Sequence, residues 1–308
     1  MPTGMVVKST GSWYMVSGTD GVVVPCRLRG RFRMEGLRTT NPLAVGDKVV
    51  YEMEPGKSSA VVTNILPRSN VIIRKATRLS SAAHIIAANL DYLMLIATIA
   101  QPRTSTGFID RFLATAEAYH IPAAIAFNKT DLLQAESDQQ LRSLTLIYES
   151  AGYPVLHVSA HTGSNLEALA AFLHNKVVLF SGHSGVGKTA LINRLIPGIN
   201  LRTGQISDKH QKGRHTTTFA EAIALPGGGW IVDTPGIKEF GLYDLEKETL
   251  AQRFPEMRRL MPDCRFANCT HIHEPGCAVK QAVANHQLAS TRYQNYVNMM
   301  FNDYTNDN

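Results

Sequence analysis

Residues 181–195 read SGHSGVGKTALINRL, and the other parts of the chain can be interpreted by their relation to this stretch. Gly182 and Gly187 bracket four residues and are followed by a lysine and a threonine, which is the phosphate-loop pattern G-x-x-x-x-G-K-[ST]. The apolar run at 177–180 precedes the loop as a strand would, and leucine and isoleucine follow it at helical spacing. This strand–loop–helix context indicates a site for a nucleoside triphosphate rather than an ordinary glycine-rich turn.

The residue types in the loop suit phosphate chemistry. Glycines let the backbone wrap closely around phosphate oxygens, and the N–H groups at the start of a helix carry partial positive charge. We expect Lys188 to reach the β- and γ-phosphates and the hydroxyl of Thr189 to bind Mg²⁺.

Strand-like and helix-like patterns alternate upstream of the loop. Such alternation predicts a mostly parallel sheet with helices on both faces, in which ligands bind beyond the carboxyl ends of the strands. We expect strands at 92–99, 122–127, 155–158 and 177–180, and helices at 108–119, 140–150 and 165–173.

The strand expected at 122–127 ends in Asn128-Lys129-Thr130-Asp131, an N-K-x-D motif that reads guanine. The Asp131 carboxylate can accept from guanine N1–H and from the 2-amino group together. Adenine offers neither donor there, and a polar group left unpaired is the source of strong discrimination. We expect Asn128 to brace the loop and Lys129 to lie along the base. An ATPase is the competing possibility, and nucleotide competition separates the two.

Ser159-Ala160 follows the next expected strand, where a backbone N–H could meet guanine O6. This pair is short and has little specificity alone. Its position at the carboxyl end of a neighbouring strand places it beside N-K-T-D in the expected sheet.

Switch elements follow the phosphate loop. Residues 201–217 are polar and rich in Gly, Lys and His, and Thr217, with Thr216 close behind, is the candidate hydroxyl for Mg²⁺ and the γ-phosphate. A hairpin expected around the glycines at 227–229 ends in Asp233-Thr-Pro-Gly236. This D-x-x-G motif places a carboxylate near the Mg²⁺ shell and a glycine N–H at the γ-phosphate.

The motifs stand in an unusual order, because N-K-T-D and S-A precede the phosphate loop. The same sheet forms if the usual chain ends are joined and new ends are opened elsewhere, since chain ends often lie close together. The arrangement resembles the circularly permuted GTPases. It also makes D-T-P-G lead out of the domain, so that a switch there can act on the C-terminal segment of the chain.

Many GTPases carry a glutamine directly after D-x-x-G that orients the attacking water. Ile237 occupies that position here and cannot do so. We therefore expect slow intrinsic hydrolysis that a partner completes, and His215 is the catalytic candidate. A solvated loop histidine is the competing interpretation.

Residues 1–68 predict a small β domain. Short β-rich runs at 5–7, 13–16, 22–29, 48–53 and 60–66 alternate with turn residues, which fits a five-stranded OB-type barrel. Alternating arginines could meet RNA phosphates from one strand face, although a solvated face that discourages edge pairing is the alternative. They are Arg27, Arg29, Arg31 and Arg33, with Arg38 just beyond.

Residues 241–308 predict a helical domain held by a metal. We expect helices at 245–254, 256–261 and 279–300. Three cysteines and a histidine between them form a Cys₃His set typical of a closed structural Zn²⁺ site, which would supply folding energy to a segment with a small core. His273 is the rival to the histidine of the set. The expected ligands are Cys264, Cys269, His271 and Cys277.

Composition places the chain among globular proteins. The 308 residues carry a formal net charge of +6, which is compatible with an anionic partner but does not identify one.

Cysteine usage and apolar runs indicate the cellular compartment. The four cysteines do not form the pattern of a secreted disulfide framework, and Cys26 stands alone in the β domain. The first residues lack the apolar core of a signal peptide, and the longest apolar run is too short to span a bilayer. We expect a soluble cytoplasmic protein with no membrane partner.

Taken together, these features resemble the RsgA (YjeQ) family of small ribosomal subunit biogenesis GTPases. The resemblance rests on the OB-like start, NKTD before GHSGVGKT, then GRHTTT, DTPG and C-x4-C-x-H-x5-C with EPGCAV around the last cysteine. It implies a multidomain α/β protein: an N-terminal OB-type barrel at 1–68, a circularly permuted GTPase domain at 69–240 and a zinc-binding helical domain at 241–308. Thr189 stands where many members have serine, and either hydroxyl can hold Mg²⁺.

The resemblance also implies an activity and partners. A monomer would hydrolyse GTP to GDP and phosphate late in 30S maturation, would bind 16S rRNA near the decoding region, and would be stimulated by the 30S subunit. The family's proposed catalytic histidine matches His215. The alternative function is an rRNA-binding assembly chaperone in which the nucleotide is mainly structural. The expected nucleotide-binding residues are Asn128, Lys129, Thr130, Asp131, Ser159, Ala160, Gly182, His183, Ser184, Gly185, Val186, Gly187, Lys188, Thr189, Ala190, Thr217, Asp233 and Gly236.

Overall fold

The computed structural model describes residues 1–28, 42–75, 83–201, 220–233 and 246–301. The chain divides into two compact units. The first contains residues 1–93, 170–181 and 195–241, and the second contains residues 94–169, 182–194 and 242–308.

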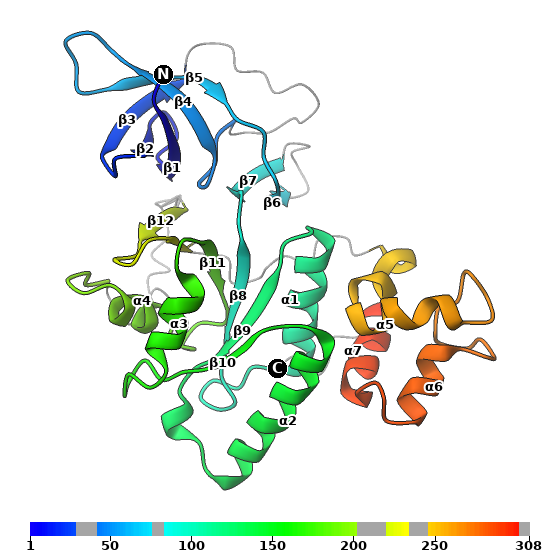
Figure 1. Cartoon of the computed structure of the whole chain (residues 1–308). Helices are drawn as coiled ribbons and strands as arrows, with labels where there is room; N and C mark the ends of the chain where they lie inside the picture. Colours follow the sequence, from blue (N-terminus) through cyan, green and yellow to red (C-terminus); the bar gives the residue numbers. More distant parts are fainter. Residues whose placement is uncertain (29–41, 76–82, 202–219, 234–245, 302–308) are drawn as a thin grey trace, which may run out of the picture. The chain divides into compact units, whose positions relative to one another are not determined.

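The N-terminal part of the first unit is a five-stranded barrel (Figure 1). Its strands follow the order β1-β2-β3-β5-β4, and β4 pairs back with β1, so the sheet closes on itself. The pairs are antiparallel except β3–β5, which is parallel. This topology confirms the predicted OB-type barrel. The strands are β1 (Thr3–Ser9), β2 (Tyr14–Gly18), β3 (Val23–Leu28), β4 (Lys48–Met53) and β5 (Ala60–Ile65).

Alternation along the strands builds the barrel core. Val6, Val16, Val49 and Val62 are all fully buried and come from four different strands. Cys26 is buried in the same cluster, and burial raises the pKa of its thiol to about 11, so this cysteine is packed rather than reactive.

A second group of strands completes the first unit. β6 (Val71–Lys75) and β7 (Ala83–Ala88) form an antiparallel hairpin that we did not predict. The expected hairpin around 227–229 forms between β12 (Glu221–Ala224) and β13 (Trp230–Asp233), and β13 also pairs in parallel with β11 (Val177–Ser181).

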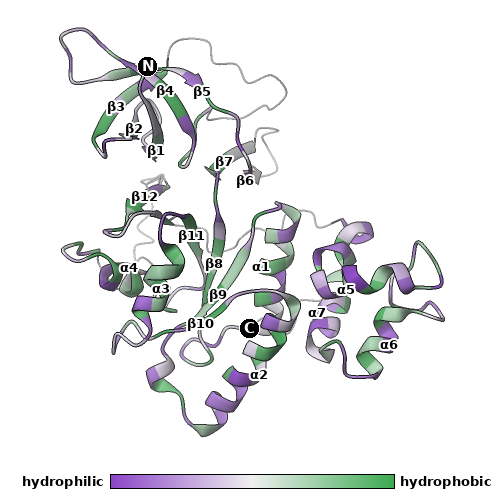
Figure 2. Cartoon of the chain, in the orientation of Figure 1, coloured by the Kyte–Doolittle hydropathy of each residue, from purple (hydrophilic) through white to green (hydrophobic). Residues whose placement is uncertain are grey.

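The α/β core of the second unit contains the strand order β10-β9-β8, with β9 and β10 parallel. All of β9 is buried, as an unbroken apolar strand of a covered parallel sheet should be, and β8 and β9 are coloured hydrophobic in Figure 2. The elements are β8 (Tyr92–Ala97), β9 (Ala123–Phe127), β10 (Val155–His157), α1 (Thr106–Ala118), α2 (Ala135–Ala151), α3 (Leu166–Leu173) and α4 (Lys188–Leu195).

Two helices here have clear end signals. The side chain of Ser105 accepts from the backbone N–H of Phe108 and so caps α1. α2 ends at Gly152, whose φ of 104° is left-handed.

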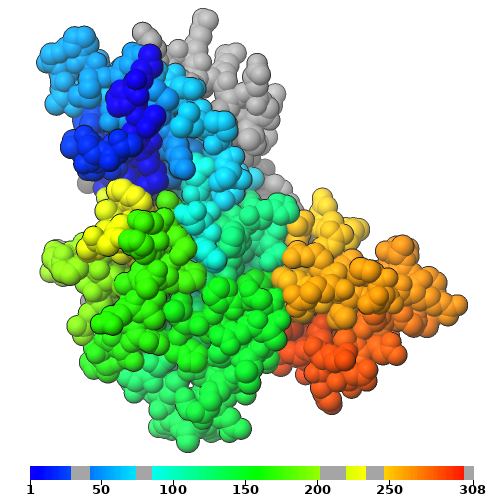
Figure 3. Space-filling view, viewed as in Figure 1, coloured from blue at the N-terminus to red at the C-terminus, as the bar shows by residue number. Residues whose placement is uncertain are grey.

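The C-terminal segment packs beside α1 and α2 as a small helical lobe, orange to red in Figure 3. Its core gathers Leu250, Phe254, Met257 and Tyr296. Two expectations need correction: the first helix is a 3₁₀ helix, and the single helix expected at 279–300 is two helices, because the chain turns at His286 with a φ of +57°. The elements are η2 (Lys247–Arg253), α5 (Pro255–Leu260), η3 (Met261–Asp263), α6 (Ala278–Ala284) and α7 (Ser290–Phe301).

Among the residues that the structure describes, no helix is both long enough and apolar enough to span a lipid bilayer.

Candidate functional site

The phosphate loop has the backbone that its glycines predict. Gly182, Gly185 and Gly187 have φ angles of 141°, 84° and 98°, which other residues rarely adopt. A Cβ at Gly182 would lie 2.2 Å from the carbonyl oxygen of Ile96, and one at Gly187 would lie 2.3 Å from Nδ2 of Asn128. The loop is therefore a close-fitting cradle that only glycine permits at these positions.

Lys188 begins α4 and folds back over the loop. Its Nζ donates to the carbonyl oxygens of Gly182, at 2.5 Å, and His183, at 2.8 Å. The ammonium is thus held at the loop by the loop's own backbone. Thr189 and Ala190 follow in the first turn of the same helix, and both are half-buried.

His183 makes a contact that the sequence motif does not reveal. Its ring packs on Phe108 in the first turn of α1, with ring centroids 3.9 Å apart and planes tilted by 33°. Burial lowers the pKa of His183, and the positive charges of Lys188 and Arg111 lower it further. A neutral imidazole therefore joins the phosphate loop to α1.

The side chain of Asn128 joins the phosphate loop to the loop that contains Ala160. Its Nδ2 donates to the carbonyl oxygen of Val186 at 2.8 Å, and its Oδ1 accepts from the backbone N–H of Ala160 at 3.0 Å. The side chain is 3% exposed, so these bonds lie in a dry environment. We expected a backbone N–H of the Ser159-Ala160 pair to face guanine O6, and in this structure the Ala160 N–H is engaged by Asn128.

Asp131 is exposed and is oriented by a buried serine. The hydroxyl of Ser159 donates to Oδ1 of Asp131 at 2.5 Å and accepts from the backbone N–H of Thr162 at 3.1 Å. This arrangement holds the carboxylate in one orientation at the carboxyl ends of β9 and β10.

The two residues between Asn128 and Asp131 also have defined contacts. Lys129 has a left-handed φ of 64°, and its Nζ donates to the carbonyl oxygen of Gln101 at 2.5 Å. The hydroxyl of Thr130 donates to the carbonyl oxygen of Val158 at 3.1 Å. Each of the four residues of the N-K-T-D loop therefore forms a side-chain hydrogen bond with a neighbouring segment.

Arg194 is a further residue of this site that sequence reasoning missed. From the last turn of α4 its Nε donates to the carbonyl oxygen of Ala160 at 2.9 Å, and its Nη2 donates to that of His161 at 2.6 Å. A basic residue at a helix C-terminus is the only signal that could have suggested such a role.

The downstream motifs are described only in part. Asp233 is half-buried at the end of β13. The other predicted residues lie outside the described residues: Thr216, Thr217, His215, Gly236 and Ile237, and likewise the arginines Arg29, Arg31, Arg33 and Arg38.

A second cluster of functional side chains lies in the C-terminal lobe. The ligand atoms of Cys264, Cys269, His271 and Cys277 all lie within 4.8 Å of one another. Nδ1 of His271 lies 3.6 Å from Sγ of Cys264 and 3.4 Å from Sγ of Cys277. Three soft thiolates and one imidazole are a donor set that suits a structural metal, and His271 rather than His273 belongs to it.

The loop that carries this cluster is fastened to α7 and to itself. The hydroxyls of Tyr293 and Tyr296 donate to the carbonyl oxygens of His271 and Thr270, at 2.8 and 2.6 Å. The carboxylate of Glu274 accepts from the backbone N–H and the hydroxyl of Thr270. Sequence reasoning did not identify these supporting residues.

Two family models match consecutive parts of the chain. The family model described as RsgA GTPase matches residues 65–243, and the one described as RsgA N-terminal domain matches residues 3–61. Small ribosomal subunit biogenesis GTPase RsgA 2 of Bacteroides thetaiotaomicron is 48% identical over 297 residues, which cover 96% of each chain. The RsgA of Flavobacterium psychrophilum is 47% identical over 304 residues, which cover 98% of this chain and 93% of the relative.

Two solved structures are similar over nearly the whole chain. The crystal structure of YjeQ from Thermotoga maritima matches with a TM-score of 0.80 and 35% identity, covering 98% of both chains. The crystal structure of YloQ, a circularly permuted GTPase, matches with a TM-score of 0.78 and 31% identity, covering 99% of this chain and 96% of that one. The permuted motif order read from the sequence therefore has a counterpart in a solved GTPase.

Proposed function

The chain belongs to the RsgA family of GTPases, and we propose that it hydrolyses GTP as a timer in the maturation of the small ribosomal subunit. The observation that carries the proposal is the pair of hydrogen bonds made by Asn128. They join the phosphate loop to the loop beside Asp131, so one rigid constellation can hold phosphates and a guanine base together.

The binding roles follow from the described contacts. The backbone of the phosphate loop would cradle the phosphates, and Lys188 would exchange its loop carbonyls for phosphate oxygens. Asp131, held by Ser159, would accept from guanine N1–H and the 2-amino group. Mg²⁺, when bound, neutralises charge on the β- and γ-phosphates. Its protein ligands would be Thr189 and Thr217, with Asp233 and Gly236 completing the switch side.

Hydrolysis needs a group that orients water, and Ile237 cannot supply one. We assign this role to His215. Its replacement by alanine should leave nucleotide binding intact and abolish the stimulated turnover. Unchanged stimulated turnover would remove His215 from the mechanism.

The Cys₃His cluster would hold one structural Zn²⁺ ion. The three sulfur donors and one nitrogen donor fit zinc. The loop that carries them is hydrogen-bonded to Tyr293 and Tyr296 of α7, so it is part of the helical lobe. The ion, when bound, supplies cross-linking of the loop rather than chemistry on a substrate.

The functional parts would correspond to residues 1–68, 69–240 and 241–308, with the barrel and the zinc lobe contacting 16S rRNA. GTP would order the segments 201–217 and 233–240, and hydrolysis would release them. Like its family, the protein would act as a monomer in the cytoplasm.

Phosphate release measured with and without purified small ribosomal subunits, at two salt concentrations, tests the function. We expect the subunits to stimulate release, and higher salt to weaken the effect because phosphate-backbone contacts release counterions. Absence of stimulation at both salts would reject the timer and favour an rRNA-binding chaperone whose nucleotide is mainly structural.

A further inference from the structure

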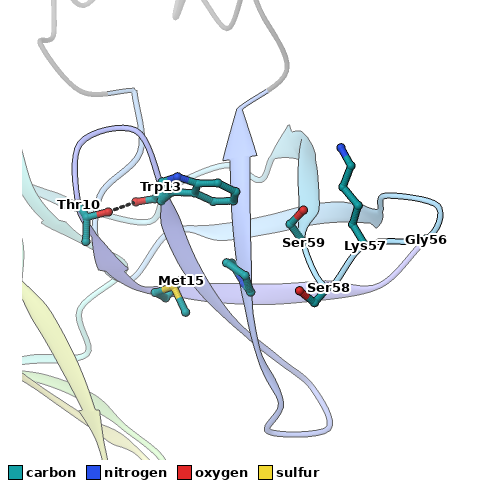
Figure 4. Close-up of a pocket in the computed structure, with 8 residues that line it drawn as sticks. Thr10, Trp13, Met15, Gly56, Lys57, Ser58 and Ser59 are labelled. Atoms are coloured by element: carbon teal, nitrogen blue, oxygen red, sulfur yellow. Dashed lines mark hydrogen bonds between the residues drawn. The ribbon is translucent and has the colours of Figure 1, made fainter.

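The barrel carries an open hollow whose walls come from two loops and two strands (Figure 4). Its volume is about 670 Å³, within the range of small-molecule sites. One loop joins β1 to β2 and the other joins β4 to β5. The lining residues are Thr10, Trp13, Met15, Pro25, Gly56, Lys57, Ser58 and Ser59.

The hollow lies on the face that OB folds use for ligands. In this fold strands 2 and 3, together with the loops between strands 1–2 and 4–5, bind oligonucleotides and oligosaccharides. Met15 on β2 and Pro25 on β3 are directly paired across the strands, so their side chains share one face and form the floor. The fold and the cavity therefore point to the same place.

Trp13 lines the hollow and offers it a flat aromatic surface. Its backbone is held in the turn, because its carbonyl oxygen accepts from the Thr10 hydroxyl at 3.2 Å and from the Thr10 N–H at 2.9 Å. The guanidinium of Arg27 lies over one face of the indole, 4.0 Å from the ring centroid. The indole is partly exposed, and because a tryptophan side chain has few torsions it loses little conformational entropy when a flat ligand stacks on it.

The opposite wall is polar but nearly charge-neutral. Lys57 pairs with Oε1 of Glu54 at 2.9 Å, and the Ser59 hydroxyl donates to Oε2 of the same carboxylate at 2.6 Å. Ser58 is exposed beside them. Because the charge of Lys57 is matched by a carboxylate, this wall suits hydrogen bonding to the uncharged edge of a nucleobase better than it suits binding several phosphates. The positive charge of Arg27 remains available to attract the phosphates of a nucleic acid.

We propose that this hollow is a stacking subsite for one unpaired base of single-stranded RNA, with the indole of Trp13 as the platform. The proposal rests on the proposed function for the presence of RNA near the barrel, and it adds where and how the barrel takes an unstacked base. Arg27 stabilises the platform, and the loop at 54–59 lines the base edge.

The direct test uses the fluorescence of Trp13 in the full chain. The sequence contains two tryptophans, so Trp230→Phe leaves Trp13 as the only reporter. Short single-stranded oligoribonucleotides should quench its emission in a saturable way, whereas an abasic ribose-phosphate strand of equal length should not. Equal quenching by both strands, or quenching by neither, would overturn the subsite.

Variants measure what the platform contributes. Trp13→Leu should weaken oligoribonucleotide binding by roughly 5- to 150-fold, as expected for loss of one stacked base, and Trp13→Phe should restore most of it. Lys48→Ala, an exposed barrel lysine outside the hollow, is the control and should change binding little. If Trp13→Leu does not fold, the quenching measurement on the intact side chain still decides.

The base-stacking subsite and the subunit-stimulated GTPase function can be rejected independently of each other. If small subunits stimulate phosphate release but the emission of Trp13 shows no base-dependent quenching, the subsite is rejected and the proposed GTPase function is retained. If bases quench the emission of Trp13 but small subunits do not stimulate phosphate release, the subsite is retained and the proposed GTPase function is rejected.

Discussion

The Nη1 atom of Arg292 lies 2.6 Å from Oδ1 of Asp110, and both side chains are buried. Arg292 comes from α7 in the C-terminal lobe, and Asp110 comes from α1 in the α/β core. Nε of Arg292 also donates to Glu256 at 2.6 Å, and Asn295 donates to the second oxygen of Asp110 at 2.6 Å. A charge-paired network in the interior therefore fixes the lobe to the helix whose first turn packs on the phosphate loop.

We predict that Arg292→Met destabilises the second unit by roughly 3–5 kcal/mol, because the Asp110 carboxylate is left buried without its cation. Urea unfolding followed by circular dichroism measures the loss. The double variant Arg292→Met with Asp110→Leu should recover part of it, since the buried Asp110 charge is removed together with its cation and only the partly exposed Glu256 loses its partner. A double variant as unstable as the single one would contradict the explanation.

The Cys₃His cluster predicts one zinc ion per chain. Cys277→Ser should reduce bound zinc and lower the thermal midpoint of the C-terminal lobe, because a ligand is lost and metal binding supplies folding energy. Cys26→Ser is the matched control, since this cysteine lies in the barrel core and should leave zinc content unchanged. Atomic absorption on the purified proteins measures the metal. Zinc retained by Cys277→Ser but lost from His273→Asn would reject the assigned ligands.

The motifs could be predicted from the sequence because their chemistry depends on residues close together in the chain. The glycines of the phosphate loop, N-K-T-D and the cysteine spacing each specify a local geometry. The five barrel strands also follow from alternation and turn residues. The contact of Arg292 with Asp110 could not be predicted in this way, because it joins residues 182 positions apart and depends on tertiary packing.

The division between α6 and α7 was missed for a different reason. The pattern over 279–300 is compatible with one helix, and no glycine or proline interrupts it. The break occurs at His286, which adopts a left-handed conformation there, while Leu288 is buried in the lobe core. Tertiary packing overrides local helix propensity at this point.

Gly187→Ala should abolish nucleotide binding. The added Cβ would overlap Nδ2 of Asn128, so the hydrogen bond of Asn128 to Val186 and the loop itself would have to move. Gly152→Ala is the control: its φ of 104° is also left-handed, but a Cβ there meets no atom within 4 Å. Titration with a fluorescent GDP analogue measures both. Similar weakening by the two variants would mean that backbone strain rather than this overlap determines the effect.

His183 predicts a contribution to acid sensitivity. Its pKa is lowered from 6.5 by burial and by Lys188 and Arg111, so below about pH 6.5 the folded protein binds fewer protons at this site than the unfolded chain. Acidification through this window therefore destabilises the fold. His183→Gln should show a smaller fall in thermal midpoint between about pH 7.5 and 5, and His161→Gln, on an exposed loop, is the control. An equal fall in wild type and His183→Gln would contradict this.

Base specificity gives the most direct test of the nucleotide site. Asp131→Asn replaces an acceptor oxygen by an amide donor while Ser159 remains to orient the side chain. GTP then loses a partner for its N1–H and 2-amino group, and we expect its affinity to fall by at least about 100-fold, because unpaired polar groups produce discrimination of this size or larger. Xanthosine triphosphate carries an oxygen in place of the 2-amino group and should bind the variant better than GTP.

Asp138 is an exposed carboxylate on α2 and provides the control, because Asp138→Asn should keep the wild-type preference. Competition against a fluorescent GDP analogue, or its xanthosine counterpart for Asp131→Asn, measures the order of affinities. Unchanged preference for GTP in Asp131→Asn would show that another group reads the base.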